Sequence, residues 1–171
     1  MSFAVLFDEH YDPPLRRTIG RLLATARTAD FAIGHVRLAT LDLTESEASG
    51  MEHCRVMVGH LDAAALVSAG ATPAHFRFLL ALAQSGRLEI RTAPHHVWNP
   101  DFSVFRGLPD GGSAVLLGAH YFGRPYPMFG LAFTCFMTQP SAVRSCVRRF
   151  ESLWHAGYDV LPVVIETLAA L

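Results

Sequence analysis

The sequence predicts a single α/β domain over residues 1–171, with a mixed β-sheet flanked by helices on both faces. Short apolar segments with the period of a strand alternate with longer segments of helical period, and turn residues separate them. The chain is also 51% hydrophobic and only 17% charged, against roughly 25% charged residues in an average domain. This apolar surplus favours a sheet buried on both faces, a self-association surface, or both.

Two strands and a helix are expected near the N-terminus. Phe3–Phe7 is short and apolar, as a strand would be. Asp12 then caps a helix opened by Pro13 and Pro14, since proline lacks the amide hydrogen that the first helical turn leaves unpaired. One face of this helix is apolar at helical spacing. The strand that follows, Phe31–Ala39, is apolar enough to lie at the centre of the sheet.

A third strand and a second helix are expected in the middle of the chain. The polar stretch 42–52 is expected to be a surface loop or a short helix. Cys54–Gly59 has the pattern of a strand that ends on a glycine, where chains commonly turn. Thr72 and Pro73 begin the helix and Gly86 ends it, because these residue types favour the two ends of a helix.

Four strands and a long helix are expected beyond that glycine. The middle two strands form a hairpin around the turn Leu-Pro-Asp-Gly-Gly. An amphipathic helix begins at Pro140, and the last segment, Val160–Leu171, is expected to be a further strand or helix. The four expected strands are Leu88–Thr92, Phe102–Phe105, Ala114–Leu117 and Leu131–Met137.

The chain contains no lysine, and all fourteen of its basic side chains are arginines. A guanidinium stays protonated and cannot replace a titrating amine. The sequence therefore excludes a P-loop lysine, a Schiff-base lysine and a lysine general acid. The net charge of −1 gives no bulk attraction to nucleic acid or to anionic lipid.

Neither a membrane segment nor a metal site is expected. No apolar run approaches the ~18 residues of a membrane span, and the start MSFAVLFDEH lacks the basic region of a signal peptide, so we expect a cytoplasmic protein. Cys54, Cys135 and Cys146 lie in apolar stretches, which is typical of reduced core cysteines. Because CxxC, HxH and HExxH spacings do not occur, we expect no metal and no cofactor.

The block from Gly86 onward resembles one half of the phospholipase D-like superfamily. In that superfamily a strand carries His-x-Lys and a distal Asp, a second strand ends in Gly-Ser-x-Asn, and a helix of the Phe-x-x-Leu-Trp type follows. The corresponding segments here are NPDFSVFRG, SAVLLGAHYFG and FESLWHAG. The resemblance covers about residues 1–158 in the order of elements, and its specific part is about 90–155. It implies a phospholipase D-like fold and a single half-domain.

The first family motif is degenerate. Its His position falls on Asn99, its Lys position on Asp101 and its distal Asp on Arg106. A shifted register would put His96 in the His position and Trp98 in the Lys position, but the apolar strand after the motif then fits less well. The lysine is missing in either register.

The second motif is degenerate as well, since Gly118 matches but Ala119 and Tyr121 stand at the Ser and Asn positions. In the family, one histidine attacks phosphorus, another protonates the leaving group, and Lys, Asn and Ser side chains hold the phosphoryl oxygens. Asn99 cannot form a phosphohistidine-like intermediate, and a carboxylate at Asp101 would repel a phosphodiester. We therefore expect no catalytic residues and none of the family's reaction.

Several polar residues are expected to gather near the carboxyl edge of the sheet, where α/β proteins usually bind ligands. A small anionic or aromatic ligand is favoured there over nucleic acid. The alternative is that the histidines lie in a surface loop, or are satisfied polar groups at strand ends, without a function. The residues of this candidate pocket are His95, His96, Trp98, Asn99, Asp101, His120, Tyr121 and Arg124.

Two further groups of polar residues are notable. Arg144, Arg148 and Arg149 lie on the long helix; such runs most often form a solvated face and less often contact an anion or nucleic acid. His35 and Arg37 lie on the same side of a strand expected to be central. A buried strand must pair such groups, so they are expected to reach a carboxylate or the edge of the pocket.

Three functions are compatible with these residues. The first is a non-catalytic phospholipase D-like domain acting as a self-associating binding or scaffold module, because single-half members resemble homodimers and the apolar surplus suits a dimer. The second is a hydrolase with replaced catalytic residues, which would use His95, His96 or His120, with Arg124 as an oxyanion clamp. The third is an accessory nucleic-acid-binding module whose arginines contact phosphate. Loss of the His and the Lys together favours the first.

Overall fold

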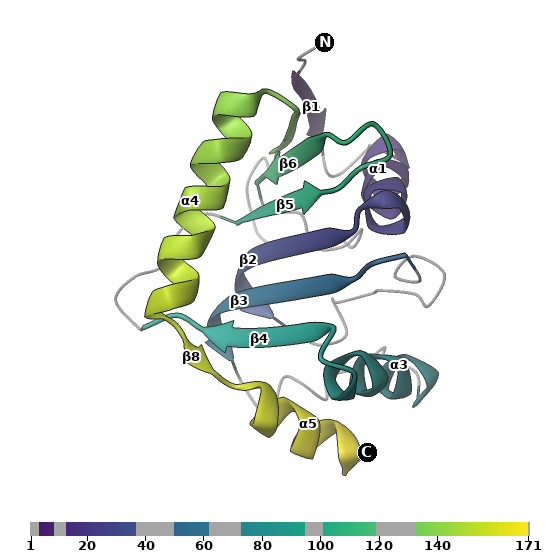
Figure 1. Ribbon diagram of the computed structural model, residues 1–171, viewed down its shortest axis with the longest axis vertical. Helices are drawn as coiled ribbons and strands as arrows, with labels where there is room; N and C mark the ends of the chain where they lie inside the picture. Colours follow the sequence, from purple (N-terminus) through teal and green to yellow (C-terminus); the bar gives the residue numbers. More distant parts are fainter. Residues whose placement is uncertain are drawn as a thin grey trace.

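The computed structural model describes residues 4–8, 13–36, 50–61, 73–94, 101–118 and 133–170. The described strands form one eight-stranded mixed sheet in the order β1-β7-β6-β5-β2-β3-β4-β8 (Figure 1). The strands are β1 (Ala4–Asp8), β2 (Thr28–Val36), β3 (His53–Leu61), β4 (Leu88–Thr92), β5 (Phe102–Arg106), β6 (Ser113–Leu117), β7 (Phe133–Met137) and β8 (Tyr158–Asp159).

Helices cover both faces of this sheet, so the predicted α/β architecture is confirmed. The apolar side chains of α1, α3 and α5 pack on one face, and those of α4 pack on the other. Figure 1 shows α4 alongside the sheet on one side and α1 and α3 on the other. The described helices are α1 (Pro13–Thr25), α3 (Pro73–Gln84), α4 (Pro140–Ala156) and α5 (Leu161–Ala169).

The strand directions define two edges of the sheet. Strands β2, β3 and β4 pair in parallel, and β5 is antiparallel to both β2 and β6. The carboxyl ends of β2, β3, β4 and β6 therefore lie along one edge, together with the start of β5. We call this the carboxyl edge, and the opposite edge the amino edge. The segments 95–100 and 119–132, which hold seven of the eight predicted pocket residues, both follow strands that end at the carboxyl edge.

The predicted hairpin is confirmed by the pairing of β5 with β6, in which Phe102 lies opposite Leu117 and Arg106 opposite Ser113. Gly107 and Gly111 in its turn have φ angles of 68° and 71°. Such angles are costly for residues with a Cβ, so glycine suits both positions.

The long helix packs as its pattern predicts. Phe150, Leu153 and Trp154 are buried on the α4 side of the sheet, whereas Val143 and Val147 are partly buried at its margin. The rings of Phe150 and Trp154 stack with their centroids 5.6 Å apart. This packing fixes α4 over β3, β5 and β6.

Two predicted strands have ends that differ from the structure. Strand β3 continues to Leu61, past Gly59, where it was expected to end. Strand β2 begins at Thr28, earlier than expected, because the polar residue Asp30 is buried and paired within it. The segment Val160–Leu171, expected to be a strand or a helix, forms the helix α5, which the short strand β8 precedes. The expected strand Leu131–Met137 begins at Phe133, and its first two residues lie outside the described residues, as does 42–49 of the polar stretch.

Candidate functional site

Of the eight predicted pocket residues, Asp101 is the one that the structure describes. It immediately precedes β5 at the carboxyl edge, and its Oδ1 accepts a hydrogen bond from the amide of Gly34 in β2 at 2.6 Å. Its backbone oxygen accepts a hydrogen bond from the amide of Gly118 at 2.9 Å. The other seven, His95, His96, Trp98, Asn99, His120, Tyr121 and Arg124, lie outside the described residues.

The resemblance assigns Asp101 and Gly118 to the Lys and Gly positions of its two motifs, and a hydrogen bond from the Gly118 amide to the Asp101 backbone oxygen joins these two residues. Gly118 follows β6 with a φ angle of 126°, a conformation that a side chain would strain. Asp101 in turn extends the link between β5 and β2 beyond their last ladder pair, Ala32 with Phe102. The two motif positions thus hold three strand ends together.

At the other end of β5 lies Arg106, the residue to which the resemblance assigns the position of the distal Asp. Its Nη2 lies 2.7 Å from Oδ2 of Asp30, whose side chain is 1% exposed. Among the described residues, the Nε of Arg106 is buried without a hydrogen-bond partner. An ion pair between neighbouring strands thus stands where the resemblance implies an aspartate.

Arg55 in β3 extends this pair into a network. Its Nε and Nη2 donate to the two carboxylate oxygens of Asp30 at 2.7 and 3.0 Å, and Nη2 also donates to Oε1 of Glu151 at 2.6 Å. Its guanidinium lies 4.8 Å from the ring centroid of Phe150 and 5.2 Å from that of Trp154. Burial alone would lower the pKa of Arg55, but the hydrogen bonds to Asp30 and Glu151 raise it.

The network connects the sheet to α4. Arg55 lowers the pKa of Glu151, chiefly through its hydrogen bond, whereas burial acts in the opposite direction. Arg91 in β4 also reaches this helix, because its Nη1 donates to the backbone oxygen of Trp154 at 2.9 Å. Its guanidinium lies 4.6 Å from the ring of the same tryptophan.

Sequence reasoning missed Asp30, Arg55 and Glu151. A signal was present, since Asp30 and Arg55 are charged residues inside otherwise apolar strands, and a buried charge must be paired. The partners could not be named, because they lie 25 and 96 residues apart from Arg55 in the sequence.

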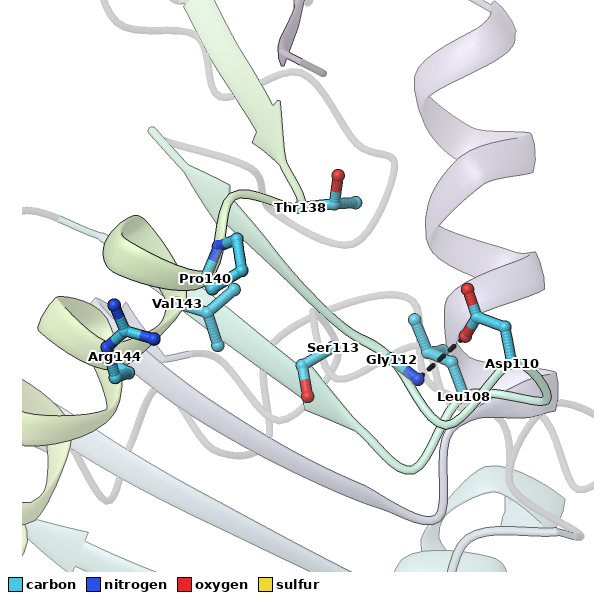
Figure 2. A pocket seen from close by; sticks show the side chains of 8 residues that line it. All are labelled: Leu108, Asp110, Gly112, Ser113, Thr138, Pro140, Val143 and Arg144. Atoms are coloured by element: carbon cyan, nitrogen blue, oxygen red, sulfur yellow. Dashed lines mark hydrogen bonds between the residues drawn. The ribbon is translucent and has the colours of Figure 1, made fainter. Parts of the chain in front are cut away.

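A pocket of about 350 Å³ lies at the amino edge (Figure 2). It lies between the β5–β6 turn, the residues after β7 and the first turns of α4. Ser113, at the start of β6, and Arg144, on α4, both line it. In the turn beside it, the amide of Gly112 donates to Oδ1 of Asp110 at 2.9 Å. This pocket contains none of the predicted pocket residues, and Asp101 lies at the opposite end of the β5–β6 hairpin.

The structure tests part of the other predictions, which concern β2, the cysteines, metal binding and membrane spans. Strand β2 lies inside the sheet, with β5 and β3 as its neighbours, as expected for a central strand. The side-chain contacts of His35, and all of Arg37, lie outside the described residues. The three cysteines are free, and Cys54 is buried as expected, whereas Cys135 and Cys146 are only partly buried and so are not full core residues. Within the described residues no group of three or more His, Cys, Asp or Glu could hold a metal, and no helix could cross a membrane.

Solved structures of other proteins share this arrangement of strands and helices. The phospholipase D family member Nuc from Salmonella typhimurium superposes with a TM-score of 0.59 at 11% identity, over 93% of this chain and 98% of that one. The chain has the phospholipase D-like fold. NucT from Helicobacter pylori, at 10% identity, shares this phospholipase D-like fold with a TM-score of 0.59 over 93% of this chain and 99% of its own.

The phospholipase D-like fold also matches part of a larger protein. TrmBL2, an archaeal chromatin protein that binds DNA, superposes with a TM-score of 0.59 at 12% identity. The match covers 92% of this chain but 55% of TrmBL2, so this chain spans little more than half of that protein's length. No protein-family model matches the sequence, and no curated protein matches it. At these identities the likeness is one of fold.

Proposed function

We propose that this chain is a non-catalytic phospholipase D-like module that self-associates and serves in binding or as a scaffold. The observation that most supports the proposal is the hydrogen bond between Gly34 and Asp101. A carboxylate stands at the position where the family motif has its lysine, and it holds β5 to β2. The side chain at this position therefore supports the fold.

The charge at Asp101 opposes the family's chemistry. A lysine there would attract the phosphoryl oxygens, and an aspartate repels them. Two unit charges ~4 Å apart interact by about 4 kcal/mol at an effective dielectric constant of ~20. Since each ~1.4 kcal/mol changes an affinity tenfold, a repulsion of this size would weaken the binding of a phosphodiester by roughly three orders of magnitude.

A hydrolysis assay tests the non-catalytic part of the proposal. Purified protein is incubated with bis(p-nitrophenyl) phosphate and, separately, with DNA, and product is followed beside a protein-free blank. We expect no turnover above the blank. Turnover that disappears in His96→Ala or His120→Ala would overturn the proposal and support the alternative, a hydrolase with replaced catalytic residues.

Self-association is proposed to occur through the region around the degenerate motifs. It is supported by the low charged fraction of 17%, because homodimer interfaces are more apolar than the remaining surface. Light scattering at micromolar concentration should give about twice the 18.7 kDa mass of the chain. A mass of one chain would remove this part of the proposal.

The proposed ligand is small and anionic or aromatic, bound at the carboxyl edge beside the degenerate motifs. Trp98, His120, Tyr121 and Arg124 offer stacking and bidentate contacts to an oxyanion, each worth roughly 1 to 3 kcal/mol when desolvated. Titration calorimetry with phosphate esters of aromatic alcohols should detect binding. Binding that survives unchanged in Trp98→Ala and Arg124→Ala would contradict this location.

Nucleic acid is the second candidate partner. The observation that favours it is the likeness to TrmBL2, whose described activity is DNA binding. Against it stands the net charge of −1, which provides no bulk attraction to a polyanion.

A further inference from the structure

The solvent face of α4 is basic. Arg144, Arg148 and Arg149 are exposed, and no hydrogen bond or ion pair joins any of them to another described residue. Four helical residues rise ~6 Å, so Arg144 and Arg148 lie on adjacent turns of the same face. The other exposed residues of this helix are Pro140, Ser141, Ser145, Ser152, His155 and Ala156.

Glu151, the single acidic residue of α4, does not pair with these arginines because it binds Arg55 instead. Both carboxylate oxygens of Glu151 accept hydrogen bonds from Arg55, at 2.6 and 3.4 Å, on the side of the helix that faces the sheet. Glu151 and Asp30 carry two negative charges, and Arg55 and Arg106 carry two positive ones, so this network is neutral by itself. Within α4, the three arginines therefore contribute a charge of +3 that no carboxylate of the helix offsets.

We propose that the arginine face of α4, formed by Arg144, Arg148 and Arg149, binds the phosphate backbone of duplex DNA without reading its sequence. Guanidinium groups bind phosphate oxygens in bidentate geometry. Like charges four residues apart destabilise a helix, and a bound polyanion removes that repulsion. Ser145, between the arginines, and the flanking Ser141 and Ser152 are short enough to let a backbone approach, and their hydroxyls can donate to phosphate.

The chemistry of the face favours a duplex over other polyanions. Binding of single strands relies on stacking the bases on aromatic side chains, and both aromatic residues of α4, Phe150 and Trp154, are buried. Membrane-surface helices insert large apolar side chains among the lipids, and none of those exposed in the described residues lies on α4. A phosphate backbone presented on the outside of a duplex requires neither feature.

The test is fluorescence anisotropy with a labelled DNA duplex of about 20 base pairs, titrated with the full chain between ~50 and ~200 mM salt. Three phosphate contacts predict a slope of about −2.7 for log K against log salt, or roughly a 40-fold loss of affinity over this range. The variant Arg144→Gln/Arg148→Gln/Arg149→Gln should bind at least tenfold more weakly at ~50 mM salt and lose most of the slope.

A matched control is available on the opposite face of the sheet. Arg17 and Arg21 on α1 and Arg77 on α3 are also exposed, so Arg17→Gln/Arg21→Gln/Arg77→Gln changes the net charge equally, from −1 to −4. This control should bind within twofold of the unchanged protein. Thermal unfolding of both variants, followed by circular dichroism, verifies that each is folded.

Several results would overturn the proposal. These are no binding at ~50 mM salt, equal weakening in the two triple variants, and tighter binding to the corresponding single strand. Tighter binding to vesicles containing phosphatidylserine would assign the face to a membrane instead. The DNA recovered after the titration is then run on a gel. Cleaved DNA would contradict the proposed non-catalytic function but would not contradict DNA binding by the arginine face.

Discussion

Arg106 in β5 and Asp30 in β2 form an ion pair, with Nη2 2.7 Å from Oδ2. The arginine stands where the resemblance to the phospholipase D-like superfamily implies an aspartate. Asp30 also binds Arg55, which in turn binds Glu151. Arg106 thus belongs to a buried, balanced group of charges that connects three strands with α4.

Replacing Asp30 by Asn should lower the free energy of unfolding by about 3–5 kcal/mol, because breaking a buried ion pair leaves its partners uncompensated. The side chains of Asp30 and Arg55 are 1% and 13% exposed. Urea denaturation followed by tryptophan fluorescence measures the change. The control, Arg27→Gln, breaks an exposed pair with Glu52 at 3.8 Å and should cost less than about 1 kcal/mol. Equal losses in the two variants would contradict the prediction.

The stability of the protein should depend on the charge of Glu151 in acid. Its hydrogen bond with Arg55 lowers its pKa below the ordinary value of 4.5. The folded protein therefore binds this proton less tightly than the unfolded chain. The stabilisation is fully present above the ordinary pKa and is lost as pH falls through the folded pKa.

The variant Glu151→Gln should accordingly be less stable than the unchanged protein near neutral pH, and the difference should shrink as the pH falls below about 4.5. Urea midpoints measured at steps between neutral pH and strong acid give the two curves. The exposed Glu166 on α5 provides the comparison, since Glu166→Gln should follow the unchanged protein. A constant difference for Glu151→Gln across the acid range would contradict the linkage.

Much of the fold could be predicted from local patterns. The range Leu88–Thr92 is both the expected and the observed strand β4, because apolar alternation and a preceding glycine define it locally. The start of β2 was missed because Thr28 and Asp30 are polar, and Asp30 is buried only because Arg55 and Arg106 from neighbouring strands pair with it. Pairing of this kind leaves no local pattern.

The candidate site was less predictable for the same reason. Asp101 was placed at the carboxyl edge from the order of strands, and it lies there. Its bond to Gly34 depends on the pairing of β2 with β5 and joins residues 67 positions apart. The sequence alone shows a carboxylate at residue 101, whereas its contribution to the fold could be recognised only from its partner, Gly34.

The cysteines should differ in reactivity. Burial raises the pKa of the Cys54 thiol, and the nearby charge of Asp30 raises it further, so this thiol stays protonated and unreactive in the folded protein. Cys146 is partly buried, and desolvation raises its pKa as well. Labelling with a maleimide at mildly alkaline pH, followed by peptide mass spectrometry, should find Cys54 protected until urea unfolds the chain. Equal labelling of Cys54 in the folded and unfolded protein would contradict its burial.

The most direct measurement is the unfolding free energy of Asp101→Lys, which introduces the residue type that the resemblance implies at this position. If Asp101 serves the fold, this variant loses the bond to the buried amide of Gly34 and should be less stable by about 1–3 kcal/mol. Replacing a residue kept for catalysis commonly leaves stability unchanged or increases it. Glu166→Lys, at an exposed position, controls for the change of charge and should remain within about 0.5 kcal/mol of the unchanged protein. A stability of Asp101→Lys equal to or above that of the unchanged protein, measured by urea denaturation, would contradict a structural function for this carboxylate.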